Sequence, residues 1–465
     1  MMRRLLHLIC LIVIIALLSG SLLLLQRPIA TPTTTAAPQE STYRMLYTRS
    51  QQDFAAMRVT LASGETYVVE SSLAFDANGN LLGVYNNLGQ PVVVRGQEDF
   101  ALDSEAYQMM LLTAVNLPVT ASYNGLDPQS CGLASPTAHI EISYHSAEPI
   151  VLTIGRKTAS GNSCYIQMAG DDSIHLVPVD FLQVMTRTLK AHHRLPGPIT
   201  KSASSAVQIA IVRPGEKNII AANYGTSGQI LPWQIDAPYT HAGSTDRITE
   251  FVQAVAAIHA DAYVTTLQNA EELAQYGLDD PTRLLVAYSD GTIRDIHLGH
   301  DAGDGTVYAR MDSTADIYRI STAQLPKVDG NATDALLDRF ISLLSTNKVA
   351  DLLITFGEKA WQLSIRTQSE QISYTINGQK VDSDTFSRAY KAVIGLEFDK
   401  TAPASSTGEP LCETRFFLTD GTTTNVTYHE YDQHYVQAET SGGGKFLLRR
   451  ERLEAMLTAL QEATP

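Results

Sequence analysis

The side chains best suited to bind a metal ion lie around one glycine in the second half of the chain. His297 and His300 flank Gly299, and Asp301 and Asp304 follow soon after. Imidazole nitrogens together with carboxylate oxygens suit several transition metals. Asp and Gly in this order are also an ordinary turn composition, because both tolerate left-handed backbone conformations. We therefore keep these four residues only as a weak candidate metal site, and we expect no cofactor.

Three patterns that resemble catalytic motifs are incomplete. The segment Gly225–Gly228 is one residue short of a nucleophile elbow. Gly442–Lys445 lacks the upstream glycine of a phosphate-binding loop, and Phe446 stands where Ser or Thr would bind magnesium. His429 and His434 lie one residue too far apart for a zinc-protease motif. No nucleophile, base and orienting group occur in a recognisable spacing, so we predict that the protein is not an enzyme.

The cysteines allow one structural bond. Cys10 lies in an apolar segment, and Cys131, Cys164 and Cys412 lie outside it, with no Cys-x-x-Cys motif that would suggest zinc. In a strand meander the segments that begin at Cys131 and Cys164 can approach each other, and a disulfide between them would suit an oxidising compartment. The alternative is two small buried hydrophobic side chains. Both interpretations stay open at this point, and both are structural.

Two other segments have a candidate binding role. Asp76–Asn80 has the alternating oxygen groups of a calcium loop, but Asn87 stands where that loop needs Glu, so we predict a turn. Trp233 lies in a short apolar run and could contact a partner, as aromatic side chains often do at interfaces. Trp361 alternates with apolar residues on one strand face and is predicted to be core.

A pattern of strands, helix and strands that recurs along the chain must position these residues. Gly132 and Gly277 are 145 residues apart, and so are Pro136 and Pro281. Self-similarity of this kind indicates repeated structural units. We predict an α+β fold in which an N-terminal transmembrane helix is followed by three tandem repeats of antiparallel strands plus a packing helix. The predicted segments are 1–27 (anchor), 28–42 (Pro/Thr linker), 43–195, 200–330 and 347–462.

Apolar residues at helical spacing predict the packing helix of each repeat over residues 107–117, 248–258 and 386–394. Ser104, Thr245 and Ser383 precede these stripes and are predicted to cap them. Three further helices are predicted as connections or at the chain end, over Phe181–Leu189, Asp334–Leu344 and Arg452–Leu460.

The first residues predict a location. Leu5–Leu25 contains no charged residue and is long enough to span a bilayer. No clean Ala-x-Ala cleavage site precedes Gln26, so we favour an uncleaved signal anchor over a removed signal peptide. Arg3 and Arg4 would stay in the cytoplasm. We therefore expect a single-pass protein of the cell membrane whose bulk is extracytoplasmic. The formal net charge of −15 disfavours nucleic acid as a partner.

The second repeat resembles a known family. Gly277-Leu278, Pro281, Asp290-Gly291, Leu298-Gly299 and Val307-Tyr308 form a signature similar to that of the DUF4340 family. The resemblance is best over residues 245–326 and extends more weakly to 104–185 and 383–460. It implies a bacterial, membrane-anchored extracytoplasmic protein without an established activity, expected beside ABC-type export or gliding systems.

We therefore expect a non-catalytic accessory or scaffold protein, associated with an ABC-type transporter in the membrane. The alternative is a cell-surface binding module for a wall polymer or peptide, which would use clefts between repeats. A hydrolase ranks third, because no catalytic group of residues was found.

Overall fold

The computed structural model describes residues 44–85, 88–225, 230–326, 332–368 and 371–464. The predicted membrane segment 5–25 and the predicted linker lie outside these ranges. Within them, no helix combines the length and the apolar composition needed to cross a membrane.

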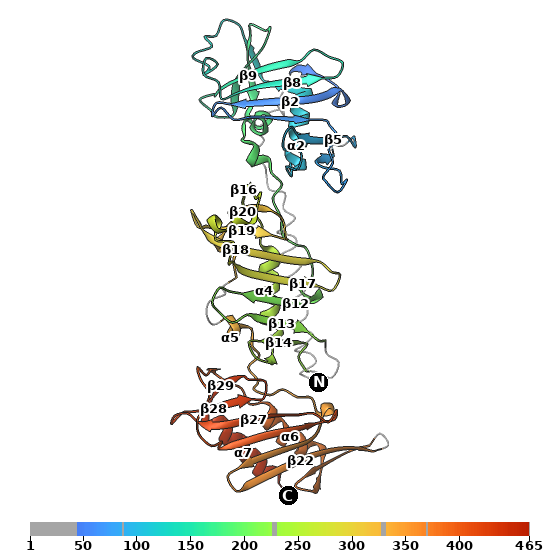
Figure 1. The fold of residues 1–465 in the computed structure, drawn as a ribbon, viewed down its shortest axis with the longest axis vertical. Helices are drawn as coiled ribbons and strands as arrows, with labels where there is room; N and C mark the ends of the chain where they lie inside the picture. Colours follow the sequence, from blue (N-terminus) through green and yellow to red (C-terminus); the bar gives the residue numbers. More distant parts are fainter. Residues whose placement is uncertain (1–43, 86–87, 226–229, 327–331, 369–370, 465) are drawn as a thin grey trace, which may run out of the picture.

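Three nine-stranded antiparallel sheets follow one another along the long axis of the molecule (Figure 1). We call them, with their helices, the first, second and third units; their strands span residues 54–178, 206–321 and 349–449. The fold is therefore α+β and dominated by strands. The idea that each unit is a DUF4340-like repeat remains a prediction, although the arrangement of the strands is closely similar in all three.

The strands of the first unit lie in the order β4 (Val84–Tyr85), β5 (Pro91–Val94), β3 (Thr66–Glu70), β2 (Phe54–Leu61), β8 (Ala138–Tyr144), β9 (Ile150–Lys157), β10 (Ser163–Met168), β11 (Ile174–Pro178), β7 (Ala121–Tyr123). A separate ribbon pairs β1 (Arg44–Thr48) with β6 (Asn116–Val119).

The second sheet has the order β15 (His241–Ala242), β14 (Trp233–Ala237), β13 (Ile219–Asn223), β12 (Ala206–Val212), β17 (Thr282–Tyr288), β18 (Ile293–Gly303), β19 (Thr306–Met311), β20 (Asp316–Ser321), β16 (Ala262–Thr266). The third has the order β24 (Gln379–Val381), β23 (Gln371–Ile376), β22 (Lys359–Gln368), β21 (Val349–Phe356), β26 (Cys412–Leu418), β27 (Thr423–Glu430), β28 (Tyr435–Thr440), β29 (Lys445–Arg449), β25 (Lys400–Thr401).

The predicted packing helices are present as α2 (Ser104–Val115), α4 (Thr245–Ala257) and α6 (Ser383–Ile394). Their caps lie one residue earlier than predicted. The Asp103 carboxylate accepts the backbone N–H of Ala106 at 2.8 Å, and Asp382 caps α6 in the same way. Ser244 precedes α4 without a side-chain cap bond. The cap residue lies just outside the helix, because its side chain accepts hydrogen bonds from backbone N–H groups two or three residues later, in the first turn.

Two of the three other helix predictions need correction. The closing helix α7 (Arg450–Ala463) is present. The helix predicted over Asp334–Leu344 is wrong, since α5 (Ala332–Leu336) is short and Phe340 then forms a β-bridge with Glu397. Residues 181–189 form only α3 (Val179–Leu182) and 3-10 turns. In the first of these cases pairing with the third unit overrides the helical periodicity.

The buried apolar residues divide into two large clusters. One is confined to the first unit and packs α2 against its sheet. The other is continuous through the second and third units, from Ala206 to Ala463. Tyr263 packs against both clusters. Its ring stacks on His193 with centroids 3.8 Å apart, and Phe100 meets His193 edge-on at 4.9 Å. The second and third units therefore share one core, whereas the first contacts the second through a small aromatic junction.

Candidate functional site

The two histidines of the weak metal candidate have separate structural partners. His297 lies on β18, and its Nε2 is 3.3 Å from an Asp295 carboxylate oxygen that also binds Arg283 at 2.7 Å. These neighbours hold the pKa of Asp295 at about 2, below its usual range, against the opposing effect of burial. The His300 ring covers Gly277, where a Cβ would lie 2.3 Å from the ring. Gly277 adopts a φ of 68°, so this glycine is required both sterically and conformationally.

The two aspartates of that candidate lie in a turn. Asp301 accepts the backbone N–H of Gly303 at 2.8 Å. The Asp304 side chain is 95% exposed and lies 3.6 Å from Arg319. Among the described residues, no three His, Cys, Asp or Glu side chains converge as metal ligands. His297, His300, Asp301 and Asp304 are thus close in sequence, but each contacts a different structural partner.

The three described cysteines are buried and free, so the structure does not form the Cys131–Cys164 disulfide. Cys164 packs in the core of the first unit, whereas Cys131 packs with Leu133 and Ile174 in a separate cluster that Tyr165 covers. Successive side chains of a strand point to opposite faces of its sheet. Cys164 and Tyr165 are neighbours on β10, so Cys164 faces away from the cluster that contains Cys131.

Trp233 is not an exposed contact. It begins β14, is 4% exposed and belongs to the core shared by the second and third units. Its remaining surface lines a pocket at the junction of these units. Any contact of Trp233 with a partner molecule must therefore occur inside this pocket. The prediction of an interface at Trp233 needs this correction, since β-sheet packing covers the indole.

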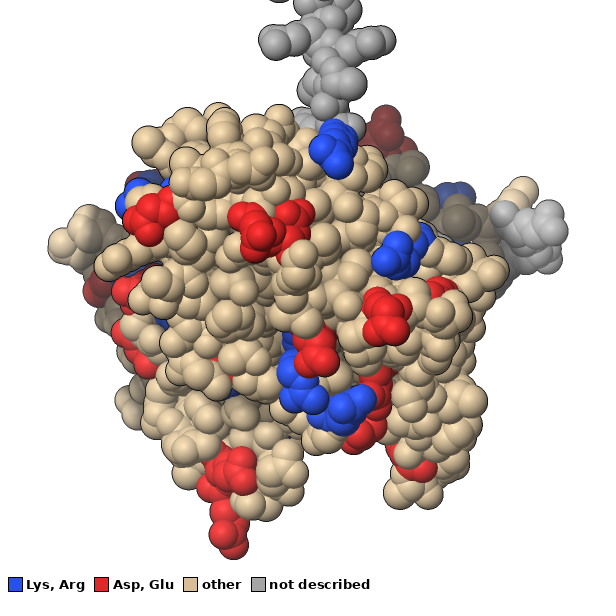
Figure 2. Space-filling view, turned by 90° about the horizontal axis from the view of Figure 1, so that it is seen from above, with Lys and Arg blue, Asp and Glu red and all other residues tan. Residues whose placement is uncertain are grey.

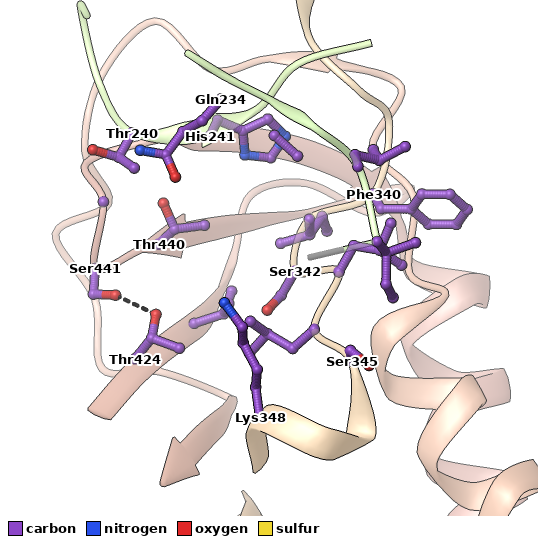
Figure 3. A pocket seen from close by; sticks show the side chains of 18 of the residues that line it. Gln234, Thr240, His241, Phe340, Ser342, Ser345, Lys348, Thr424, Thr440 and Ser441 are labelled. Atoms are coloured by element: carbon purple, nitrogen blue, oxygen red, sulfur yellow. Dashed lines mark hydrogen bonds between the residues drawn. The ribbon is translucent and has the colours of Figure 1, made fainter. Parts of the chain in front are cut away.

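The pocket has a volume of about 480 Å³ and is open to solvent. Three parts of the chain form it (Figure 3): the β14–β15 end of the second unit, the connecting segment 340–348, and the β26–β27 and β28–β29 turns of the third unit. Its polar lining residues are Gln234, Thr240, His241, Ser342, Ser345, Lys348, Asp420, Thr423, Thr424, Thr440 and Ser441.

Hydroxyl groups and one cation dominate the polar wall. Thr424 and Ser441 share a hydrogen bond of 2.7 Å between their hydroxyl oxygens. The Lys348 side chain extends into the space beside Ser342 (Figure 3). Gln234 donates its amide N–H to Asp236 at 2.7 Å. This bond uses one of the two amide N–H donors of Gln234, so the amide oxygen and the second N–H remain for a ligand.

A neutral histidine of the second unit lines the pocket. His241 is 6% exposed, and its Nε2 donates to the carbonyl oxygen of Asp338 at 3.1 Å. Its ring lies 4.6 Å from the ring of Phe446 in the third unit. Burial lowers the pKa of His241 to about 4. This histidine is therefore uncharged at neutral pH, which leaves Lys348 as the cation of the pocket wall.

A second candidate site is an exposed apolar surface on the first unit. It comprises Leu73 (65% exposed) and Phe75 (60%) at the hairpin closed by the Phe75–Leu81 bridge, and Tyr85 (55%) on the following strand β4. The hairpin is ordered by the predicted turn: Asp76 accepts the backbone N–H groups of Asn78 at 2.8 Å and Asn80 at 2.7 Å. The interpretation of 76–80 as a turn is confirmed. We call Leu73, Phe75 and Tyr85 the hairpin surface.

Sequence patterns did not identify either site. The pocket depends on the packing of two units, and its residues Lys348 and Ser345 lie in a connection with no motif. The hairpin surface has a weak signal, since Leu73 and Phe75 alternate with small residues beside a strong turn. An apolar alternation of this kind does not tell which face is covered.

Comparison with known proteins gives one match. Residues 233–411 match the model of a domain of unknown function, DUF4340. The resemblance predicted from the signature in residues 277–320 is therefore confirmed. The match begins at β14 and ends just before β26, so it includes the second-unit lining residues from Trp233 onward and the segment 340–348. It is a single segment and does not identify further copies. No curated protein and no solved structure matches the chain.

Proposed function

We propose that this chain, with DUF4340 at residues 233–411, is a non-catalytic accessory or scaffold protein anchored in the cell membrane. Its bulk is extracytoplasmic, and its first unit docks on the outer face of a membrane-embedded partner of the ABC-type export class. The observation that supports this proposal is the ordered hairpin surface of the first unit.

Exposed apolar side chains are unevenly distributed among the described residues. Most of the large ones lie in the first unit, and Leu73 and Phe75 have the highest exposed fractions of all. Apolar groups that are gathered on one surface usually mark an interaction site. The hydrogen bonds of Asp76 fix the hairpin before binding, which lowers the ordering cost of association.

The position of the first unit favours a partner in the membrane. The predicted anchor and linker precede this unit in the chain, so it would be the unit nearest the bilayer. The end of the molecule that it forms carries scattered acidic and basic side chains within a largely uncharged surface (Figure 2). This mixture suits a protein surface better than anionic headgroups, which attract clustered Lys and Arg.

Site-specific photo-crosslinking in intact membranes tests the proposal. The full-length chain would carry a photoreactive residue at Phe75, and captured proteins would be identified by mass spectrometry. A matched position is Ile372, which is 55% exposed in the third unit. We expect transporter subunits to be captured from position 75 and not from 372.

Two outcomes would contradict the proposal. One is capture of the same proteins at equal yield from both positions. The other is capture of only the chain itself from position 75. A Leu73→Ser, Phe75→Ser double variant adds a second measurement: it should lose the transporter on co-purification, whereas Ile372→Ser should retain it.

A second function, that of a surface module which binds a wall polymer, is favoured by the pocket between the second and third units. The two functions are compatible, because the pocket and the hairpin surface belong to different units.

A further inference from the structure

We propose that the pocket between the second and third units binds an acidic saccharide, a sugar unit that carries a carboxylate. Lys348 would bind the carboxylate, and the hydroxyl side chains around Thr424 and Ser441 would bind the ring hydroxyls. This inference does not rest on the docking of the first unit, and each can fail without the other.

The dimensions fit a ligand of one or a few sugar rings. A volume of about 480 Å³ lies within the range of about 300–1,000 Å³ that small-molecule sites occupy. The pocket is open to solvent, so a longer polymer could place one unit inside while its chain continues outside. Leu344 and Val426 line the apolar part of the wall, which offers contact to the C–H face of a sugar.

The charge calls for an acidic ligand. Lys348 forms no salt bridge with a described residue, but hydrogen bonds from Thr422 and then the positive charge of Lys348 lower the pKa of the Asp420 carboxyl. The carboxylate among the lining residues belongs to Asp420, and it accepts both the backbone N–H of Thr422 at 2.9 Å and the hydroxyl of Thr422 at 2.6 Å. Asp420 is thus engaged within its own turn. The Lys348 ammonium group has three donors for a ligand anion.

The hydroxyl side chains favour a sugar over a plain carboxylic acid. Each Ser or Thr hydroxyl donates one hydrogen bond and accepts others, as each sugar hydroxyl does. Thr424 and Ser441 already form a bonded pair, and Ser441 Oγ also accepts the backbone N–H of Asn425 at 3.3 Å. One hydroxyl hydrogen of the pair remains for a ligand. Ser342 lines the same space (Figure 3), whereas the Thr440 hydroxyl accepts the backbone N–H of Gly444 at 3.0 Å. The carbonyl oxygen of Gln234 adds an acceptor.

A peptide strand does not fit this pocket. Peptides that extend a sheet need unpaired main-chain groups at its edge. The edge strand here is β15, and its neighbouring groups are occupied: Thr240 donates its N–H to Gly442 at 3.0 Å, and Ala242 accepts from Asp338 at 2.9 Å. A ligand in this pocket would therefore be bound by side chains rather than by main-chain groups.

The test is a binding titration of the full-length protein, solubilised in detergent, with oligomers of galacturonic acid and with neutral galactose oligomers of the same length. Calorimetry gives the affinity. The chain contains two tryptophans, and Trp233 lines the pocket, so a change in intrinsic fluorescence gives an independent readout. We expect the acidic oligomers to bind and the neutral ones to bind at least tenfold more weakly.

Two variants locate the site. Lys348→Met removes the charge while keeping a long unbranched side chain, and it should weaken binding of the acidic oligomer at least tenfold. Thr424→Val with Ser441→Ala should weaken both acidic and neutral oligomers. Lys380→Met is the control, because Lys380 is an exposed lysine on β24 at the far edge of the third sheet, and it should bind like the unmodified chain.

Three results would overturn the proposal. The first is no heat and no fluorescence change with acidic oligomers at millimolar concentration. The second is equal affinity of Lys348→Met and the unmodified protein. The third is tighter binding of a free-carboxylate peptide than of the acidic oligomer, which would assign the pocket to a different class of ligand.

Discussion

Thr240 of the second unit donates its backbone N–H to the carbonyl oxygen of Gly442 in the third unit, at 3.0 Å. The approach is close enough that a Cβ at Gly442 would lie 2.5 Å from the Thr240 carbonyl oxygen. Gly442 has an ordinary negative φ, so the constraint is one of space. This contact closes one side of the pocket and joins the two units.

Gly442→Ala is therefore expected to destabilise the junction of the second and third units. Overpacking of this kind typically costs about 1–3 kcal/mol, and urea denaturation measures it. The control is Gly408→Ala, since a Cβ at Gly408 meets no atom within 4 Å. Equal unfolding midpoints for the two variants would show that the junction can shift without cost.

Stability should fall as the solution is acidified from pH 6.5 toward pH 4. Burial lowers the pKa of His241 from 6.5 to about 4, so in this window the unfolded state binds a proton that the folded state does not. The contribution of His241 is complete above pH 6.5 and is lost as the pH falls to 4, by about 3 kcal/mol at most. Unfolding free energies at several pH values between 4.5 and 7.5 measure the slope.

His241→Phe should flatten this slope, because phenylalanine keeps the aromatic contact with Phe446 but has no proton to bind. The control is His259→Phe, which changes a half-exposed histidine and should leave the slope as it is. His192 is also buried, with its pKa lowered to about 4, so part of the slope should remain in His241→Phe. An unchanged slope in that variant would refute the assignment.

A buried arginine should be essential for the second unit. Arg294 is 1% exposed and contacts Asp312 at 2.5 Å. It also donates to the carbonyl oxygens of Gly197, in the linker between the first and second units, and Ile258. In Arg294→Met, water can solvate the Asp312 carboxylate, which is 35% exposed. The two carbonyl oxygens would be left unpaired, and each unsatisfied buried polar group costs about 1–3 kcal/mol. Chemical denaturation with circular dichroism measures this loss.

The comparison for Arg294→Met is Lys201→Met. Lys201 pairs with Asp290 at 2.5 Å on the surface, where both side chains are about half exposed. Exposed pairs contribute roughly 0–1 kcal/mol, so this variant should unfold almost like the unmodified protein. An equal loss of unfolding free energy in the two variants would show that the burial of Arg294 does not make its contacts more stabilising than an exposed ion pair.

The thiols should be unreactive in the folded chain. Cys131, Cys164 and Cys412 are each 5% exposed or less, and burial raises the pKa of Cys412 to about 12. Only thiolates react readily with maleimides or iodoacetamide. We expect slow labelling of the native protein at pH 8 and full labelling of all three after denaturation without reductant. Labelling of Cys131 and Cys164 that requires reductant would instead reveal a disulfide.

Local patterns predicted the elements that local forces determine. The stripe around Phe251 and Val252 gave α4, and the alternation around Trp361 gave the buried face of β22. Strand pairs beside strong turns, such as β17 and β18 around Asp290-Gly291, were also predictable, since the turn sets the register. The signature in this region led to the family that the comparison confirms.

Features that depend on the contact of distant segments were not predictable. The segment after Leu336 has helical periodicity, yet it lies extended because Ile341 donates to Leu396 at 2.9 Å. The short apolar run around Trp233 suggested a residue that contacts a partner. The packing of Gly243 and Ile248 near it shows that Trp233 belongs to the core. Cys131 and Cys164 similarly required knowledge of sheet faces.

The division of the buried residues into two clusters has a consequence for cooperativity. One cluster belongs to the first unit, and the other runs without interruption through the second and third. Cooperative melting follows shared burial rather than the number of sheets. A calorimetric scan of the molecule should therefore resolve two heat-absorption peaks, with the larger enthalpy in the one that melts the paired units. A chain of three sheets would thus behave thermodynamically as two bodies, and the pocket would vanish in a single step with the larger one.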